Sequence, residues 1–223
     1  YVVLYQLHGP DVRVNLFGAG GTTFEKPSAD DEVPLEETLG VLGDLVIEGK
    51  IRSVGLSNET SWGVSKSLEA SRQGKPRVVS IQNAYNLINR TFELGLAEFA
   101  LREQVGLLAY SPLAQGYLTG KYLDGARPAG ARTTLFDRGQ RYEKPGVDDA
   151  IRAYLALAQE FGIDPVQLAV AFVTSRSFVT SNIIGASSIA QLQTILGSVD
   201  VEITPELDSR INAIHQIHNN PAP

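Results

Sequence analysis

The sequence predicts an α/β fold in which short parallel strands alternate with amphipathic helices. Three apolar runs begin at Ile51, Val78 and Val105, at intervals of 27 residues. Each run is short, and a stretch with helical periodicity separates it from the next. This alternation is typical of βα units, whose strands pair in a parallel sheet through right-handed crossovers.

The remaining elements follow in order along the chain. The predicted strands are residues 2–7, 51–56, 78–81, 105–109 and 178–184. About seven helices are predicted, starting near Pro34, Ser61, Phe92, Val147, Pro165, Ser188 (capped by Ser187 or Ser188) and Pro205. Asp164 and Thr204 each precede a proline and are expected to cap their helices. Residues 123–146 form a long connecting segment, and the final NNPAP is expected to fray.

A second long connection, residues 12–33, is rich in Gly, Thr, Asp and Pro and is predicted to be a flexible loop. It contains FGAGGTT at residues 17–23, which superficially resembles a phosphate-binding motif. These glycines do not join a strand directly to a helix, as a dinucleotide-binding fingerprint requires.

Polar residues or glycine follow each predicted strand at the same point. They are His8, then Ser57 and Asn58, Gln82 and Asn83, Tyr110 and Ser111, and Gly185. In a parallel barrel these strand ends share one rim, where active sites are built. Each residue alone has a structural interpretation, since Asn and Ser commonly end strands, and an isolated His8 reads as a hydrogen-bonded surface histidine. Five ends in one register favour a functional rim.

The stretch YSPLAQGYLTGKY at residues 110–122 has the chemistry of a binding loop. Tyr110 offers a flat aromatic face, Gly116 and Gly120 allow close approach of the backbone, and Lys121 adds a positive charge. This combination suits a ligand with a flat ring and a phosphate group. Taken alone, the stretch is interpreted equally well as an ordinary surface loop.

Composition narrows the classes of function. The 223 residues are 43% hydrophobic and carry a net charge of −6, with no basic stripe of the kind that binds nucleic acid. No apolar run approaches the ~20 residues of a membrane span. The chain has no cysteine and three scattered histidines, which argues against a metal site. It also lacks methionine and opens on Tyr1 in a strand-like run, so we expect the latter part of a longer protein.

Four ordered motifs resemble those of the aldo-keto reductases. They are LYQLH (4–8), GKIRSVGLSN (49–58), IQNAYNLINR (81–90) and YSPLAQGYLTGKY (110–122). GARPAGARTTLF (125–136) and the ending HQIHNNPAP resemble the bacterial Tas-type branch of that family. The resemblance covers essentially the whole chain. It implies a (β/α)8 TIM barrel, of which residues 1–223 would supply the fourth strand onward, about five of eight strands, as one partial barrel.

The resemblance also assigns roles to individual residues. His8 matches the catalytic histidine that orients the substrate carbonyl, although Gly9 follows it where tryptophan is usual. The Asp, Tyr and Lys of the catalytic tetrad would lie before Tyr1, so the chain alone is expected to be inactive.

The family resemblance implies NADP(H) as cofactor, and the residues expected to bind it form four groups along the chain. Those assigned to the nicotinamide carboxamide are Ser57, Asn58 and Gln82, and Tyr110 would stack on the nicotinamide ring. Those assigned to the loop around the pyrophosphate are Ser111, Pro112, Leu113, Ala114, Gln115, Lys121 and Arg132. Those assigned to the adenosine end are Gly185, Ser187 and Gln191. Thr194 and Ile195 replace the Glu and Asn that the family often has, which predicts weaker adenine contacts.

The function implied by the resemblance is an NADP(H)-dependent oxidoreductase that reduces aldehydes or ketones by hydride transfer, without a metal. Its expected partner is a small-molecule carbonyl substrate rather than nucleic acid or a membrane, and its expected location is the cytoplasm. Substrate identity and oligomeric state are left open. An alternative is a non-catalytic, cofactor-binding regulatory protein of the same fold, similar to a channel subunit. The upstream part of the tetrad would discriminate between the two.

Overall fold

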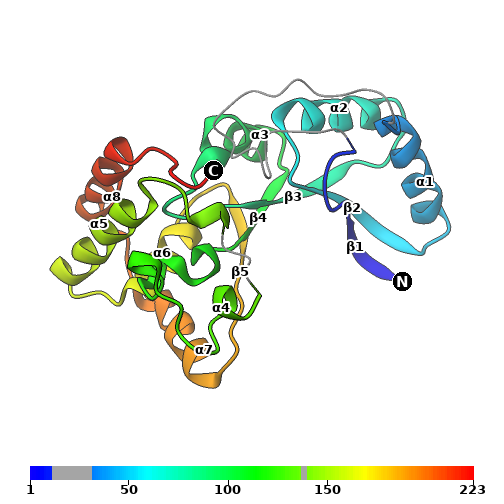
Figure 1. The fold of residues 1–223 in the computed structure, drawn as a ribbon. Helices are drawn as coiled ribbons and strands as arrows, with labels where there is room; N and C mark the ends of the chain where they lie inside the picture. The colour runs from blue at the N-terminus through cyan, green and yellow to red at the C-terminus, as the bar shows by residue number, and fades with distance from the viewer. Residues whose placement is uncertain (12–31, 137–139) are drawn as a thin grey trace. The chain divides into compact units, whose positions relative to one another are not determined.

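A computed structural model describes residues 1–11, 32–136 and 140–223 of the chain (Figure 1). The loop predicted at residues 12–33 therefore lies almost wholly outside the described residues. The chain forms two compact units. Unit 1 contains residues 1–83 and 92–108, and unit 2 contains residues 84–91 and 109–223. Each unit is described by itself.

The strands form a five-stranded sheet in chain order, β1-β2-β3-β4-β5. In unit 1, β1 (Val2–Gln6), β2 (Ile51–Ser57) and β3 (Val78–Ala84) pair in parallel. β4 (Gly106–Tyr110) runs from unit 1 into unit 2, where β5 (Val179–Ile183) lies. The predicted α/β fold is confirmed, and the arrangement is consistent with a partial (β/α)8 barrel.

Two helices of unit 1 begin where local signals predicted. α1 (Leu35–Ile47) follows Pro34, and α2 (Ser61–Arg72) begins at the predicted Ser61, where Thr60 caps it by accepting a hydrogen bond from the Gly63 amide. The helix predicted from Phe92 is instead divided at Gly95. A 3₁₀ turn (Thr91–Leu94) precedes that glycine, and α3 (Leu96–Arg102) follows it.

Unit 2 holds four longer helices, which are α5 (Val147–Glu160), α6 (Pro165–Thr174), α7 (Ile189–Leu196) and α8 (Pro205–Ile217). α5 packs against α8 and α6 against α7 (Figure 1). The predicted caps are present. The side chains of Asp164, Ser188 and Thr204 accept hydrogen bonds from first-turn amides of their helices.

The core of unit 2 centres on Phe172 of α6, which is fully buried. Its ring stacks on Tyr85 at a centroid distance of 5.7 Å, and the guanidinium groups of Arg90 and Arg176 both lie over it. Arg90 also donates to Asn212 on α8, 2.8 Å away. These contacts fix residues 84–91, which connect β3 to the rest of the fold, on the helices of unit 2.

One of the long irregular segments contains a helix that was not predicted, and the prediction for the C-terminal tail was wrong. The connecting segment 123–146 contains a short helix, α4 (Arg132–Phe136), which no amphipathic pattern in the sequence predicts. The C-terminal tail is docked rather than frayed. Asn220 accepts a hydrogen bond from the Arg90 amide (2.6 Å), and Ala222 is fully buried, with its amide donating to the Ile88 carbonyl.

Candidate functional site

The loop that follows β4 carries concentrated backbone strain. Ser111, Ala114 and Gln115 adopt left-handed φ angles of 57°, 49° and 57°. An L-residue in this region costs roughly 1–2 kcal/mol. Such strain persists only where the surroundings enforce it, and it gathers at functional sites. The loop therefore has a conformation that sequence propensity alone would not select.

The side chain of Asn86 holds the first residues of this loop in their left-handed conformation. This side chain is fully buried, donates through Nδ2 to the Ser111 carbonyl (3.0 Å), and accepts through Oδ1 from the Ile88 amide (3.1 Å). The Tyr85 amide donates to the Tyr110 carbonyl (3.3 Å) beside it. Because one buried amide uses both its donor and its acceptor, it fixes the start of the loop relative to residues 85–89.

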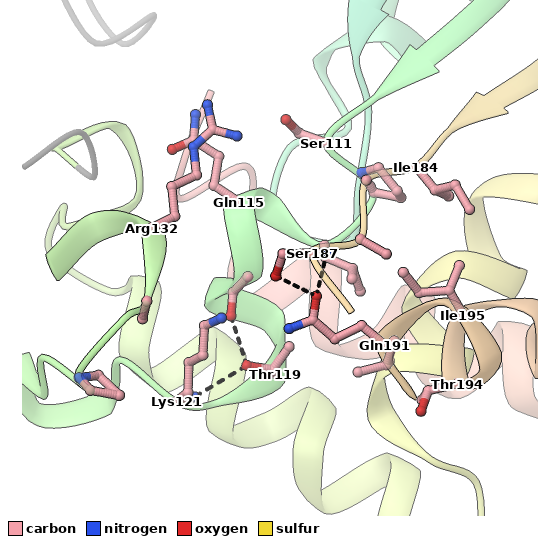
Figure 2. A pocket seen from close by; sticks show the side chains of 18 of the residues that line it. Ser111, Gln115, Thr119, Lys121, Arg132, Ile184, Ser187, Gln191, Thr194 and Ile195 are labelled. Atoms are coloured by element: carbon pink, nitrogen blue, oxygen red, sulfur yellow. Dashed lines mark hydrogen bonds between the residues drawn. The ribbon is translucent and has the colours of Figure 1, made fainter. Parts of the chain in front are cut away.

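The loop forms one wall of a pocket of about 860 Å³ in unit 2 (Figure 2). Residues 128–132, the strand end at 183–187 and α7 form the other walls. Every cofactor residue predicted in unit 2 lines this pocket except Ala114, which is buried behind the lining. Those lining residues are Tyr110, Ser111, Pro112, Leu113, Gln115, Lys121, Arg132, Gly185, Ser187 and Gln191.

The pocket is positively charged. Lys121 and Arg132 line it, and none of the described residues in its lining is Asp or Glu. Within the described residues, neither cation forms an ion pair. The Lys121 ammonium lies close to the Tyr122 ring and to Gly116. Its Nζ lies 5.1 Å from the centre of the Tyr122 ring, and a Cβ built on Gly116 would lie 3.0 Å from it. The absence of Cβ at Gly116 thus gives the ammonium its place.

Gln191 on α7 adds a third hydrogen-bond donor to the pocket. Its Oε1 accepts from the backbone amide of Ser187 (2.9 Å) and from the Ser187 hydroxyl (3.0 Å). A backbone amide can only donate, so the orientation of the Gln191 side chain is determined. Its Nε2 points away from Ser187 on the pocket side, as Figure 2 shows. A site lined with two cations and an outward amide donor suits an anionic ligand.

The opposite end of the pocket is apolar. Ile183, Ile184 and Ile195 line it together with Val166. Thr194 lies beside them, but its hydroxyl donates to the Ala190 carbonyl within α7 (3.1 Å). The weaker adenine contacts expected from these positions stay a prediction.

Two tyrosines of the loop, Tyr117 and Tyr122, pack in a cluster with Tyr142. The Tyr117 ring lies 4.5 Å from Tyr122 and 5.5 Å from Tyr142. The Tyr117 hydroxyl donates to Glu143 (2.6 Å), which also pairs with Arg127 (2.7 Å). Burial, followed by this hydrogen bond, raises the pKa of Tyr117 to about 12. Arg127 is thus neutralised by a carboxylate, unlike Arg132.

The predicted residues of unit 1 form a separate hydrogen-bonded group at the ends of β1, β2 and β3. Asn58, which is buried with φ 55°, donates through Nδ2 to the His8 carbonyl (2.8 Å) and to Ser57 Oγ (3.0 Å). Ser57 Oγ donates to the Gln82 carbonyl (2.7 Å). The side chain of His8 is exposed. Asn58 therefore ties the position of His8 to the strand end that carries Ser57.

Glu59 follows this group and was not singled out from the sequence. Its carboxylate accepts from the Thr60 amide (2.8 Å) and occupies the space that a side chain at position 63 would fill, since a Cβ on Gly63 would lie 2.1 Å from Oε1. Burial raises the pKa of Glu59, a shift that the hydrogen bonds with Thr60 oppose. In the sequence, the signal that could have indicated this contact was the glycine four residues after Glu59.

Comparison with known proteins bears directly on this arrangement. The model of the aldo/keto reductase family matches residues 1–216.

The chain belongs to the aldo/keto reductase family.

Its relatives include oxidoreductases from several organisms. The chain is 45% identical to "Protein tas" of Escherichia coli K12 over 224 residues, which cover 100% of this chain and 64% of that protein. It is 35% identical to an aldo-keto reductase of Babesia bovis, over 96% of this chain and 80% of the relative. It is 34% identical to L-glyceraldehyde 3-phosphate reductase of E. coli K12, over 76% of this chain and 51% of that protein. The chain thus spans 64% of the length of the Tas protein it matches.

The resemblance to the aldo-keto reductases and their Tas-type branch is confirmed, and with it membership of a family of oxidoreductases that generally use a nicotinamide cofactor. Within the described ranges, every helix is too short or too polar to pass through a lipid bilayer. No group of three or more His, Asp or Glu side chains in the described part of this aldo-keto reductase is placed to hold a metal ion.

Three residues of the aldo-keto reductase site escaped sequence reasoning. Asn86 lies within a quoted motif, but nothing in its spacing showed that it would hold the loop. Thr119 organises the loop from inside, donating to the Gly116 carbonyl (2.8 Å). Tyr122 lies next to Lys121 and has no distinguishing pattern. All three contact backbone atoms, and Tyr122 also contacts the Lys121 ammonium through its ring; such contacts leave no trace in residue spacing.

Proposed function

We propose that the pocket of unit 2 binds the phosphate-bearing part of NADP(H), and that the whole protein reduces aldehydes or ketones. The observation that supports this most is the charge of the pocket. Lys121 and Arg132 line it, its lining has no acidic residue within the described part of the chain, and Gln191 adds a donor fixed by Ser187. Its volume of about 860 Å³ is of the size that accommodates a large cofactor.

Each group of residues has a proposed task. Lys121, Arg132 and Gln191 bind phosphate oxygens, and the ring of Tyr110 stacks on the nicotinamide. In unit 1, Ser57, Asn58 and Gln82 form a separate hydrogen-bonded group whose polar atoms suit a carboxamide. The bound cofactor supplies the hydride that reduces the carbonyl carbon, and the carbonyl oxygen takes up a proton. His8 orients the carbonyl oxygen, with its backbone fixed by the 2.8 Å hydrogen bond from Asn58.

Binding is the direct test, measured by fluorescence titration with NADPH. Lys121→Gln and Arg132→Gln should each raise the Kd about tenfold or more, since a charge-assisted hydrogen bond contributes roughly 1.5–3 kcal/mol. Both effects should shrink at high salt. Arg127→Gln is the matched control, because Arg127 is paired with Glu143 instead of lining this pocket. An unchanged Kd in both pocket variants would refute the assignment.

Two further probes separate the finer claims. Adenosine 2′,5′-bisphosphate lacks the nicotinamide and should compete with NADPH for the same pocket. NADH should bind more weakly than NADPH, and equal affinity would overturn the preference for NADP(H). Consumption of NADPH with 4-nitrobenzaldehyde by the whole protein tests the reaction. Binding without turnover would instead favour the cofactor-binding regulatory role.

A further inference from the structure

Tyr122 contacts one pocket cation directly and the backbone next to the other, although it does not line the pocket. It is buried, with 3% of its surface exposed. The face of its ring lies 5.1 Å from the Lys121 ammonium. Its hydroxyl oxygen accepts the backbone N–H of Thr133 at 3.2 Å. Thr133 directly follows Arg132, the first residue of α4. One side chain therefore touches Lys121 through its ring and the backbone beside Arg132 through its oxygen.

The hydroxyl contact matters because α4 is weak on its own. The helix has five residues, fewer than an isolated helix needs to persist in water. The first amides of any helix lack partners inside the helix, and Thr133 is buried, so water cannot readily replace the Tyr122 oxygen. Without that acceptor the Thr133 amide would be left without its partner, and the direction of the first turn would be less well defined.

The ring contact matters for a different reason. The Lys121 side chain is exposed and carries four rotatable bonds, so its ammonium could point in many directions. An aromatic face attracts a cation within about 6 Å of its centre. Gly116 keeps the neighbouring space open, since any Cβ there would lie 3.0 Å from the ammonium. The ring of Tyr122 and the bare backbone of Gly116 together restrict the ammonium to the loop surface.

We propose that Tyr122 is a positioning residue that aims both pocket cations, Lys121 through its ring and Arg132 through its hydroxyl. This inference rests on the proposed function, because aiming the cations matters only if they bind phosphate. It goes further by dividing one tyrosine into two separable parts. The hydroxyl serves Arg132 and not Lys121, whereas the ring serves Lys121.

Double-mutant cycles test this division by NADPH titration. Tyr122→Phe removes only the hydroxyl and should raise the Kd by about three- to tenfold, the scale of one net hydrogen bond. That increase should vanish when Arg132→Gln is already present, and it should persist in full beside Lys121→Gln. Tyr122→Met also removes the ring. Its additional loss of affinity should vanish in the Lys121→Gln background and persist in the Arg132→Gln background.

A purely structural role for the hydroxyl is tested by a matched control elsewhere in unit 2. Thr204→Val removes a hydroxyl that also accepts a helix amide at 3.2 Å, at the start of α8, which does not line the pocket. Both Thr204→Val and Tyr122→Phe should lower the melting temperature, but only Tyr122→Phe should change the Kd. Phenylalanine keeps the ring volume, so the hydroxyl arm remains measurable even if Tyr122→Met fails to fold.

The outcomes separate the two levels of inference. If Arg132→Gln weakens NADPH binding but Tyr122→Phe does not, the positioning role is wrong while the proposed function stands. If the Tyr122→Phe effect is the same in the Arg132→Gln and Lys121→Gln backgrounds, the hydroxyl does not act through Arg132, and the division is wrong. If neither cation affects binding, the proposed function fails and the role of Tyr122 fails with it.

Discussion

Gly116→Ala separates the backbone requirement of the pocket loop from its electrostatic one. Gly116 has φ 97°, and an added Cβ would lie 3.0 Å from both Cε and Nζ of Lys121. The left-handed backbone alone should lower the free energy of unfolding by roughly 1–2 kcal/mol. The Lys121 side chain is flexible, so it yields to the new methyl group instead of clashing. Its ammonium should then move by a few tenths of an ångström.

That displacement sets the expected loss of affinity. At an effective dielectric constant of about 20, an ammonium about 4 Å from a phosphate interacts by about 4.2 kcal/mol, and at about 4.4 Å by about 3.8 kcal/mol. The difference of about 0.4 kcal/mol corresponds to roughly twofold in Kd. Lys121 is exposed and solvent screens the interaction, so about twofold is the upper limit of the expected effect. The loss should diminish as salt is raised.

Gly74→Ala is the matched control for the backbone. Gly74 has a similar φ of 91° and no heavy atom within 4 Å of the position of an added Cβ. Urea unfolding should show comparable destabilisation in both variants, whereas NADPH titration should show weaker binding only in Gly116→Ala. Equal destabilisation with unchanged affinity in Gly116→Ala would refute the placing of the Lys121 ammonium by the bare glycine.

Three further perturbations have defined outcomes. Asn86→Ala should lower the free energy of unfolding by roughly 2–4 kcal/mol and weaken NADPH binding, because the Ser111 carbonyl and the Ile88 amide both lose their partner. Urea unfolding and NADPH titration measure the two effects. Unchanged binding would show that Asn86 does not hold the pocket loop. The raised pKa of Glu59 means that the folded state holds the proton more tightly than the unfolded state, so stability should fall as pH rises from the ordinary value of 4.5 through the folded pKa. Glu59→Gln should abolish this fall, and melting curves that keep the same pH slope would contradict it. Asp164→Ala should cost about 1 kcal/mol by removing the cap of α6, with Asp164→Asn close to neutral in the same unfolding assay.

Local signals in the sequence predicted most of the fold. Asp164, Ser188 and Thr204 act as caps because the bonds that they form lie within three residues along the chain. Strand ends were less accurate. β3 continues to Ala84 instead of Ile81, because pairing with a neighbouring strand, and not apolar character, decides where a strand stops.

Features that depend on distant contacts could not be predicted. In α4, the Thr133 amide donates to the hydroxyl of Tyr122, eleven residues earlier. The tail is ordered because Asn220 meets Arg90, 130 residues earlier in the chain. In the candidate site, the pattern of glycines and charges identified the loop and Lys121. The residues that hold them in place were missed, because a buried Asn or Tyr looks the same in a sequence whether it supports a site or only fills a core.

A series of hydrogen bonds joins the docked tail to the pocket loop. The Ala222 amide donates to the Ile88 carbonyl, the Ile88 amide donates to Asn86 Oδ1, and Asn86 Nδ2 donates to the Ser111 carbonyl. Segments held by few contacts open more readily than a packed core. Opening of residues 220–222 would free the Ile88 carbonyl, whose peptide unit adjoins the Ile88 amide bonded to Asn86. Amide hydrogen exchange at Ile88 would therefore report on the order of the pocket loop, even though Ile88 lies outside the pocket lining.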